Sequence, residues 1–361
     1  MSVDRFVDWS LAQRVAVGVA GGGGEPGYFS PAAVESACAD AGALVLDYTR
    51  LTPGRPLPRP EVIDRAEWAR VGLGTLRELS HAFEARVASG MKGPGPLGAI
   101  ARSLAGAAAG AEAGVAVGYG ARRVLGQYDV ALVDSDREPR LLFVAPNLAS
   151  THAQLGETRH LFLRWIAIHE TTHAVQFTSV PWLRPHLADL LEQLIQGASD
   201  QIDRASLQGL AKRLFRTDPR RTIRSLLQGD LARMLAGPDQ ARVLDRLQAA
   251  MSVIEGHAEH VMDAAAATAD PGYARLRERL DARRARRGGL GEVISRLLGM
   301  EMKLRQYKLG KAFCDSVARE AGIEGLNRVW SGPEALPSTD ELERPAVWLE
   351  RMRAGNAAAA A

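Results

Sequence analysis

Apolar residues recur three or four positions apart along most of the chain, which is the spacing of one face of an α-helix. Ser30 followed by Pro31 is typical of a helix N-terminus and predicts a helix that runs to about Leu51. The proline-rich segment 53–60 then predicts a rigid linker, and a second long amphipathic helix follows over about 63–83. The first quarter of the chain is therefore expected to be helical.

Two short segments depart from this helical spacing. Residues 128–133 (YDVALV) and 141–145 (LLFVA) are apolar runs of strand length, and the polar turn 134–139 between them predicts a β-hairpin. From Arg159 to the end the pattern is helical again. The chain is thus expected to be mainly α-helical, with a small β-hairpin or short sheet.

Glycines cluster in two places. A stripe with one glycine every four residues predicts a helix that a neighbour approaches closely, and Glu112 within it favours a packed internal helix over a membrane or oligomer seam. The stripe consists of Gly106, Gly110, Gly114 and Gly118. The run Gly21–Gly24 lacks the GK[ST] ending of a phosphate-binding loop, so we interpret it as a connector.

The chain has 361 residues, 46% of them hydrophobic, which is enough for one large core. We predict one domain over 1–353, with an N-terminal helical part (1–90), a Gly/Ala-rich helix and hairpin (91–150) and the helices that follow (151–353). The remaining residues 354–361 predict a disordered alanine-rich tail.

The cysteine content and the N-terminus suggest the compartment. Cys38 and Cys314 are far apart, which excludes a disulfide framework and a cysteine-based zinc site. The N-terminus has no signal-peptide pattern, and the most apolar segment, 101–121, is too weakly apolar for stable membrane insertion. We therefore expect a cytoplasmic protein.

Charge gives little information about partners, because 45 basic and 42 acidic residues nearly balance. The arginine-rich segment 275–287 lacks interleaved aromatic residues and is interpreted as a solvated helix end. Nucleic acid is therefore not an expected partner.

The motif that carries chemistry is HExxH at His169, Glu170 and His173. Residues four apart share one face of a helix, so both imidazoles are able to bind one zinc ion. Glu170 lies beside that face and is placed to act as the general base that takes a proton from water. The motif therefore predicts a Zn²⁺ site.

A catalytic zinc site of this kind needs a third protein ligand, and Glu255 is the leading candidate. Its neighbours His257 and His260 stay open as alternatives. Gly256 is small enough to let this segment pack closely on the HExxH helix. Glu259, one turn beyond Glu255, is predicted to accept a hydrogen bond from the far nitrogen of a ligating histidine.

A di-iron carboxylate bundle is the competing metal hypothesis, because Glu170 and His173 also form an ExxH signature. Such a bundle needs a second ExxH. The residues three positions before His257 and His260 are Ile254 and His257, so neither supplies the required glutamate.

Three segments resemble the zincin-like metallopeptidase-type family, whose members are also described as hydrolases or as coenzyme F420 biosynthesis-associated proteins. The segments are IAIHETTHAVQFTSVPWL (Ile166–Leu183), EGHAEHVMD (Glu255–Asp263) and MEMKLRQYKLGKAF (Met300–Phe313), and the resemblance extends from about Val15 to Arg353. It implies a mainly helical zincin-like fold, in which His169 and His173 hold zinc, Glu170 is the catalytic carboxylate and Glu255 the acidic ligand. The pattern HExxH then ExxxE also resembles the thermolysin-like gluzincins. Those usually have Asp where this chain has Glu259.

The function predicted from these observations is zinc-dependent hydrolysis of a peptide or related amide bond. The edge of strand 141–145 is expected to bind an extended peptide by strand addition, with Asn147 as a substrate contact. Tyr307 or His260 is the candidate donor to the oxyanion. The alternative is a non-catalytic scaffold or binding protein, in which His257 or His260 closes the zinc site as a fourth ligand. Substrate identity and oligomeric state stay open.

Overall fold

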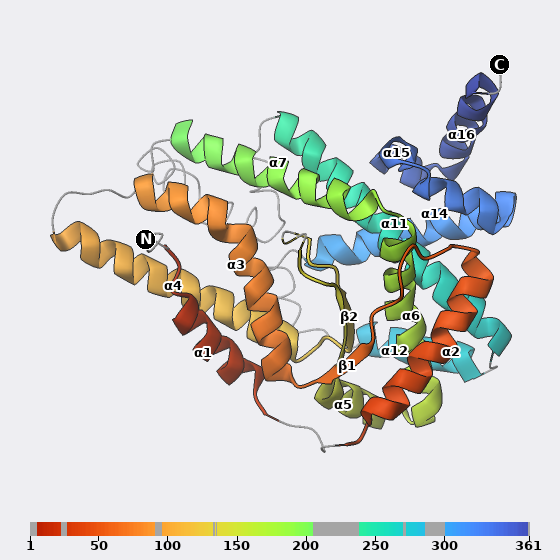
Figure 1. The fold of residues 1–361 in the computed structure, drawn as a ribbon, viewed down its shortest axis with the longest axis horizontal. Coiled ribbons are helices and arrows are strands. Elements are labelled where there is room, and N and C mark those ends of the chain that lie inside the picture. The colour runs from red at the N-terminus through yellow and green to blue at the C-terminus, as the bar shows by residue number, and fades with distance from the viewer. Residues whose placement is uncertain are drawn as a thin grey trace.

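The computed structural model describes residues 6–22, 27–90, 96–132, 134, 136–204, 238–269, 272–285 and 300–359. Within these ranges the chain is mainly α-helical with one small sheet, as the sequence predicts (Figure 1). The helices ahead of the HExxH motif are α1 (Trp9–Ala20), α2 (Pro31–Thr49), α3 (Arg65–Gly90), α4 (Pro96–Ala121) and α5 (Ala145–Leu155). The helices from the motif onward are α6 (Arg159–Ser179), α7 (Leu183–Arg204), α11 (Pro238–Ala269), α12 (Gly272–Ala285), α14 (Met300–Asn327), α15 (Thr339–Glu343) and α16 (Pro345–Ala359).

The sheet has three strands rather than the two of the expected hairpin. Strands β1 (Pro60–Ile63), β2 (Gly126–Asp129) and β3 (Arg140–Val144) are ordered β1-β3-β2. The hairpin pairing of β2 with β3 is antiparallel as predicted, but β2 covers Gly126–Asp129 instead of the expected 128–133. β1 is parallel to β3. β1 begins at Pro60, the last residue of the segment interpreted as a rigid linker. Proline is tolerated at the first position of an edge strand, and Pro60 occupies that position.

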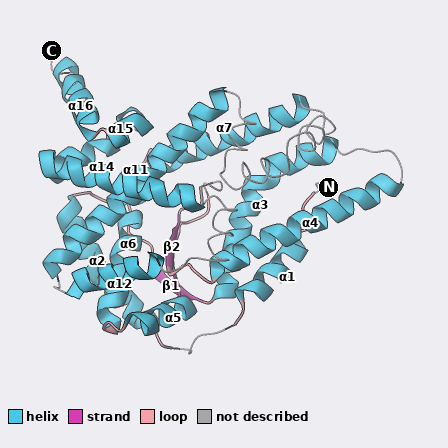
Figure 2. Ribbon diagram, turned by 180° about the vertical axis from the view of Figure 1, so that it is seen from behind, coloured by secondary structure: helices cyan, strands magenta, loops and turns pink. Residues whose placement is uncertain are grey.

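The position of β3 corrects the expectation that its edge receives a peptide. Because β3 is central, both of its edges are already paired, and the strand at the motif side of the sheet is β2. In both views the sheet lies between the group α1, α3 and α4 and the group that contains α2, α6 and α12 (Figure 2). β2 is therefore the edge nearest to the functional motif.

Helix α6 forms the centre of the largest core cluster. Thr158 caps its N-terminus by accepting a hydrogen bond from the Leu161 amide, and almost every residue from Leu161 to Thr178 is buried. Helix α2, capped by Ser30 as the sequence predicts, packs along it. A helix that is buried on all sides has no solvent-exposed face, so the polar side chains of α6 need hydrogen-bond partners within the protein.

The crossing of α11 and α14 depends on two glycines. A Cβ on Gly256 would collide with the backbone of Gly310, and a Cβ on Gly310 would collide with the carbonyl of Ser252. Gly256 therefore allows close approach to α14, and the expectation that it serves contact with the HExxH helix is wrong. This crossing holds α11 against α14.

The glycine stripe of α4 packs on α1, which confirms the interpretation as a close helix contact. Added Cβ atoms at Gly106, Gly110, Gly114 and Gly118 would meet backbone or Cβ atoms of residues 6–19. No helix in the described part of the chain is long and apolar enough to cross a membrane. Helix α16 continues to Ala359, so it includes residues 354–359 of the segment that was expected to be a disordered tail.

We expect Gly310→Ala to destabilise the fold although alanine favours helices. Overpacking at a backbone contact costs about 1–3 kcal/mol, which exceeds the gain of about 1 kcal/mol in helix propensity. The matched control is Gly74→Ala in α3, where an added Cβ meets nothing within 4 Å. Urea unfolding would measure both variants, and equal midpoints for the two would contradict the close crossing.

Candidate metal centre

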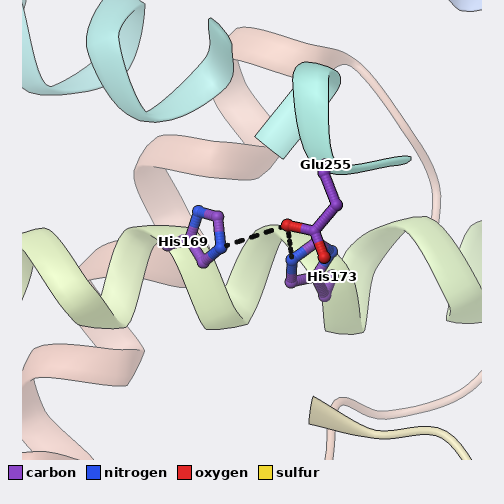
Figure 3. Close-up of side chains that lie close together, drawn as sticks. All are labelled: His169, His173 and Glu255. Carbon is purple, nitrogen blue, oxygen red and sulfur yellow. Dashed lines mark ion pairs between the residues drawn. The ribbon is translucent and has the colours of Figure 1, made fainter. Parts of the chain in front are cut away.

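Three of the predicted ligands come together in the structure. His169 and His173 lie one turn apart on α6, with ring centroids 4.8 Å apart. Glu255 reaches them from α11, where its Oε2 lies 3.8 Å from Nε2 of His169 and 3.6 Å from Nε2 of His173 (Figure 3). The ligand atoms all lie within 4.8 Å of one another, so the three residues form a possible metal site.

The donor set and the local field both suit a divalent cation. Two imidazole nitrogens and one carboxylate are the ligand types of catalytic zinc. Burial by itself would lower the pKa of His173, but the nearby carboxylates of Glu255 and Glu170 outweigh it and raise this pKa to about 9. The site thus stabilises positive charge strongly, and zinc fits the residues present.

Gln176 fixes the orientation of His173, a role that the sequence reading missed. Nδ1 of His173 donates to Oε1 of Gln176 at 2.9 Å, which leaves Nε2 as the nitrogen that faces Glu255. The amide nitrogen of Gln176 donates to the carbonyl of Ile254 and to Nδ1 of His257. Gln176 is three residues from His173 on the same helix, and this spacing is the signal that could have identified it.

His257 is not a ligand in this structure. Its ring is fully buried and packs edge-on against Trp330, with centroids 5.3 Å apart. Burial, with smaller effects from the nearby histidines, lowers its pKa to about 3, so the ring is neutral. His257 therefore supports the amide of Gln176 rather than completing a metal site.

His260 points into a different cluster from the three converging residues. Its roles as an alternative ligand or an oxyanion donor stay predictions. Nε2 of His260 lies 2.7 Å from the hydroxyl of Tyr48, and Nδ1 lies 2.8 Å from Asp315. Lys311 bridges Asp315 and Asp263 at 2.6 and 3.1 Å. Both ring nitrogens of His260 are thus engaged away from Glu255.

Glu259 belongs to the same network of ion pairs, which continues from Lys311 and Asp263 to Arg277. Arg277 of α12 contacts Glu259 at 3.1 Å and Asp263 at 2.9 Å. Glu259 also lines the cavity beside His169. A hydrogen bond between Glu259 and a ligating histidine stays a prediction. The contacts of Arg277 do show that part of the arginine-rich segment serves internal ion pairs.

Glu170 is held against strand β2. Its side chain is buried, and Oε2 accepts a hydrogen bond of 3.1 Å from the backbone amide of Tyr128. A Cβ on Gly126 would lie 2.6 Å from Cγ of Glu170, so glycine is needed at this position of β2. Burial raises the pKa of Glu170 to about 7, with Glu255 adding to the shift and His173 opposing it.

Two further site predictions concern Asn147 and Tyr307. Asn147 is buried, and its amide donates to the carbonyls of Ala121 and Val124 while accepting from Arg65. It therefore joins α5 to the end of α4, and the substrate contact stays a prediction. Tyr307 lies on α14, but its side chain is outside the described part of the structure, so its role stays a prediction.

We expect Gln176→Leu to lower zinc affinity about 10- to 100-fold, because the variant removes the partner that orients a ligating histidine. Gln176→Glu keeps an acceptor for His173 and should retain most of the affinity. Gln196→Leu, at an exposed position of α7, is the matched control. Competition with a chromogenic chelator measures all three, and wild-type affinity in Gln176→Leu would contradict the orienting role.

Asp315 gives a prediction for the pH dependence of stability. Burial alone would raise its pKa, but hydrogen bonds from His260 and Lys311 outweigh that effect and hold the pKa below 3.8. The unfolded chain then binds more protons near this pH, so the stabilisation is present above pH 3.8 and is lost as the pH falls below it.

The measurement is urea unfolding of wild type and Asp315→Asn at pH 7 and at pH 3. The variant should be less stable at pH 7, and the difference should narrow at pH 3. Asp340→Asn, at an exposed site 3.6 Å from Arg344, serves as control. A difference that stays constant with pH would show that the charge of Asp315 contributes nothing.

The family model of the zincin-like metallopeptidases matches residues 7–349. A crystal structure of a candidate hydrolase with a novel fold, from Chloroflexus aurantiacus, superposes with a TM-score of 0.70 at 30% sequence identity. The match covers 96% of this chain and 99% of that one. No protein with a curated description matches the chain. Together with the HExxH helix and its convergent glutamate, this match shows that the chain belongs to the zincin-like metallopeptidase family.

Proposed function

We propose that the protein is a zinc-dependent hydrolase that cleaves peptide or related amide bonds. The observation that carries this proposal is the convergence of His169 and His173 with Glu255 from a distant helix. The family match and the related candidate hydrolase support the same reaction class. Zinc held by such ligands supplies Lewis acidity and lowers the pKa of water to about 7.

Glu170 is the group of this chain that moves protons. Its buried carboxylate, with a pKa of about 7, is matched to accept a proton from water near neutral pH and to return it to the leaving amine. The amide of Tyr128 keeps this carboxylate beside His173, and Gly126 gives it the space to lie there. The protein thus positions its base through backbone atoms.

An extended peptide fits the outer edge of β2. This strand is at the edge of the sheet, and it contacts α6 through Glu170. Backbone pairing at a sheet edge binds a peptide independently of its sequence. The substrate strand is therefore proposed to lie along β2, in place of the β3 edge expected from the sequence.

A purely structural zinc site is the alternative, and the surroundings of the three ligands argue against it. Structural zinc sites are saturated by four protein ligands. The residues that would close the site are His257 and His260, and each is hydrogen-bonded elsewhere. Among the described residues this leaves three protein donors, the number found in catalytic sites.

We expect Glu170→Gln to reduce hydrolysis of a fluorogenic peptide library by about 10²- to 10⁴-fold, the usual contribution of a general base. Zinc content should stay at the wild-type level, since Glu170 is not a ligand. Glu320→Gln, on the surface beside Arg353, is the matched control. Full activity in Glu170→Gln, or purified wild-type protein that binds no zinc, would refute the proposal.

A further inference from the structure

A cavity of about 260 Å³ lies beside the two motif residues His169 and Glu170. Its remaining walls come from α6, α11, α12 and the segment that leads into β2. Pockets for whole small molecules usually have volumes of about 300–1,000 Å³. This cavity is smaller, so it suits one side chain or one small group better than an entire ligand.

Apolar side chains form about half of the wall. Trp165 and Ile166 of α6 are buried at one side, and Met262 of α11 and Leu280 of α12 are buried as well. Leu125, which is half-buried, lines the cavity just before β2. Burial of an apolar ligand group against these side chains is favourable, because it removes apolar surface from water.

The charged side chains of Glu259 and Arg123, which also line the cavity, interact with other residues of the protein. Glu259 is paired with Arg277 at 3.1 Å. The guanidinium of Arg123 lies 3.2 Å from the centroid of the Tyr119 ring and donates to the Tyr119 carbonyl. Neither group offers an isolated charge to the apolar walls, so an ionised side chain would lose its hydration there.

We infer that this cavity binds a single large apolar side chain of the substrate, of the size of leucine or phenylalanine, next to the bond that is cleaved. The inference rests on the proposed function for the chemistry, because the cavity shares His169 and Glu170 with the metal centre. It adds the substrate class: peptides or amides with a bulky apolar residue at the position beside Glu170.

Binding is measured on Glu170→Gln protein with zinc added, by fluorescence anisotropy of labelled pentapeptides. The peptides have glycine at all positions except the centre, which is Gly, Leu, Phe, Asp or Lys. Burial of a full apolar side chain corresponds to about 10- to 100-fold in affinity, so Leu and Phe should bind that much more tightly than Gly. Equal affinities, or tightest binding of Asp or Lys, would overturn the inference.

Variants then show whether the cavity is the place of recognition. Leu280→Trp fills the cavity and should abolish the preference for Leu and Phe without weakening the Gly peptide. Leu280→Met conserves volume and should keep the preference. Leu125→Trp fills the cavity from a half-buried position and serves if Leu280→Trp does not fold. A preference that survives filling of the cavity would overturn the inference.

The two proposals fail in different ways. Loss of the peptide preference with intact Glu170-dependent hydrolysis overturns only the assignment of the cavity. Selective binding of Leu and Phe peptides, abolished by the filling variants, supports the cavity even where wild-type protein hydrolyses none of them. That second result counts against the proposed hydrolase.

Discussion

The register between α6 and α11 is the constraint on which the site depends. The two histidines come from one helix and Glu255 from another, so a shift of either helix by one residue would separate the donors. The amide of Gln176 fixes this register, because it contacts His173 on its own helix and Ile254 and His257 on α11. In a buried location each of these hydrogen bonds would be costly to leave unmade.

The other face of α11 is held by packing and by charge. Gly256 and Gly310 bring the backbones of α11 and α14 into contact. The ion pairs that run through Arg277 and Lys311 then tie α11 to α12 and α14. On α11 these contacts are made by Ser252, Gly256, Glu259 and Asp263, whose i, i+4, i+7, i+11 spacing places them along one face of the helix. They hold that face of α11 against α14 and α12. Such support is what keeps ligand groups in place before a metal binds.

The sequence was most informative where local spacing determines the structure. The four-residue separation in HExxH places both imidazoles on one face, the Ser30–Pro31 pair gives the start of α2, and the hairpin of β2 and β3 follows from its polar turn. Long-range relations were less accessible. Strand β1, which begins at the end of a proline-rich segment, was not predicted, because its parallel pairing with β3 depends on residues about 80 positions away.

The polar residues show the same limit. Asn147, Glu259 and His260 each had a chemically reasonable role near the expected metal site, and helical spacing alone did not reveal their partners. The structure gives Asn147 backbone carbonyls of another helix and gives His260 the pair Tyr48 and Asp315. A polar side chain is directed by its nearest partner in three dimensions, and that partner is usually distant in sequence.

The amide of Tyr128 has a consequence for the order of events at the site. One N–H group makes one strong hydrogen bond at a time, and in this structure Glu170 takes it. If a substrate strand lies along β2 as proposed, a substrate carbonyl that pairs with this amide would displace the carboxylate, so the amide positions the base only until the substrate is bound. Loss of that donor makes the carboxylate a stronger base. Under the proposed function, occupation of the strand edge and release of the base would be one exchange of hydrogen bonds, which would couple substrate binding to proton abstraction through a single backbone amide.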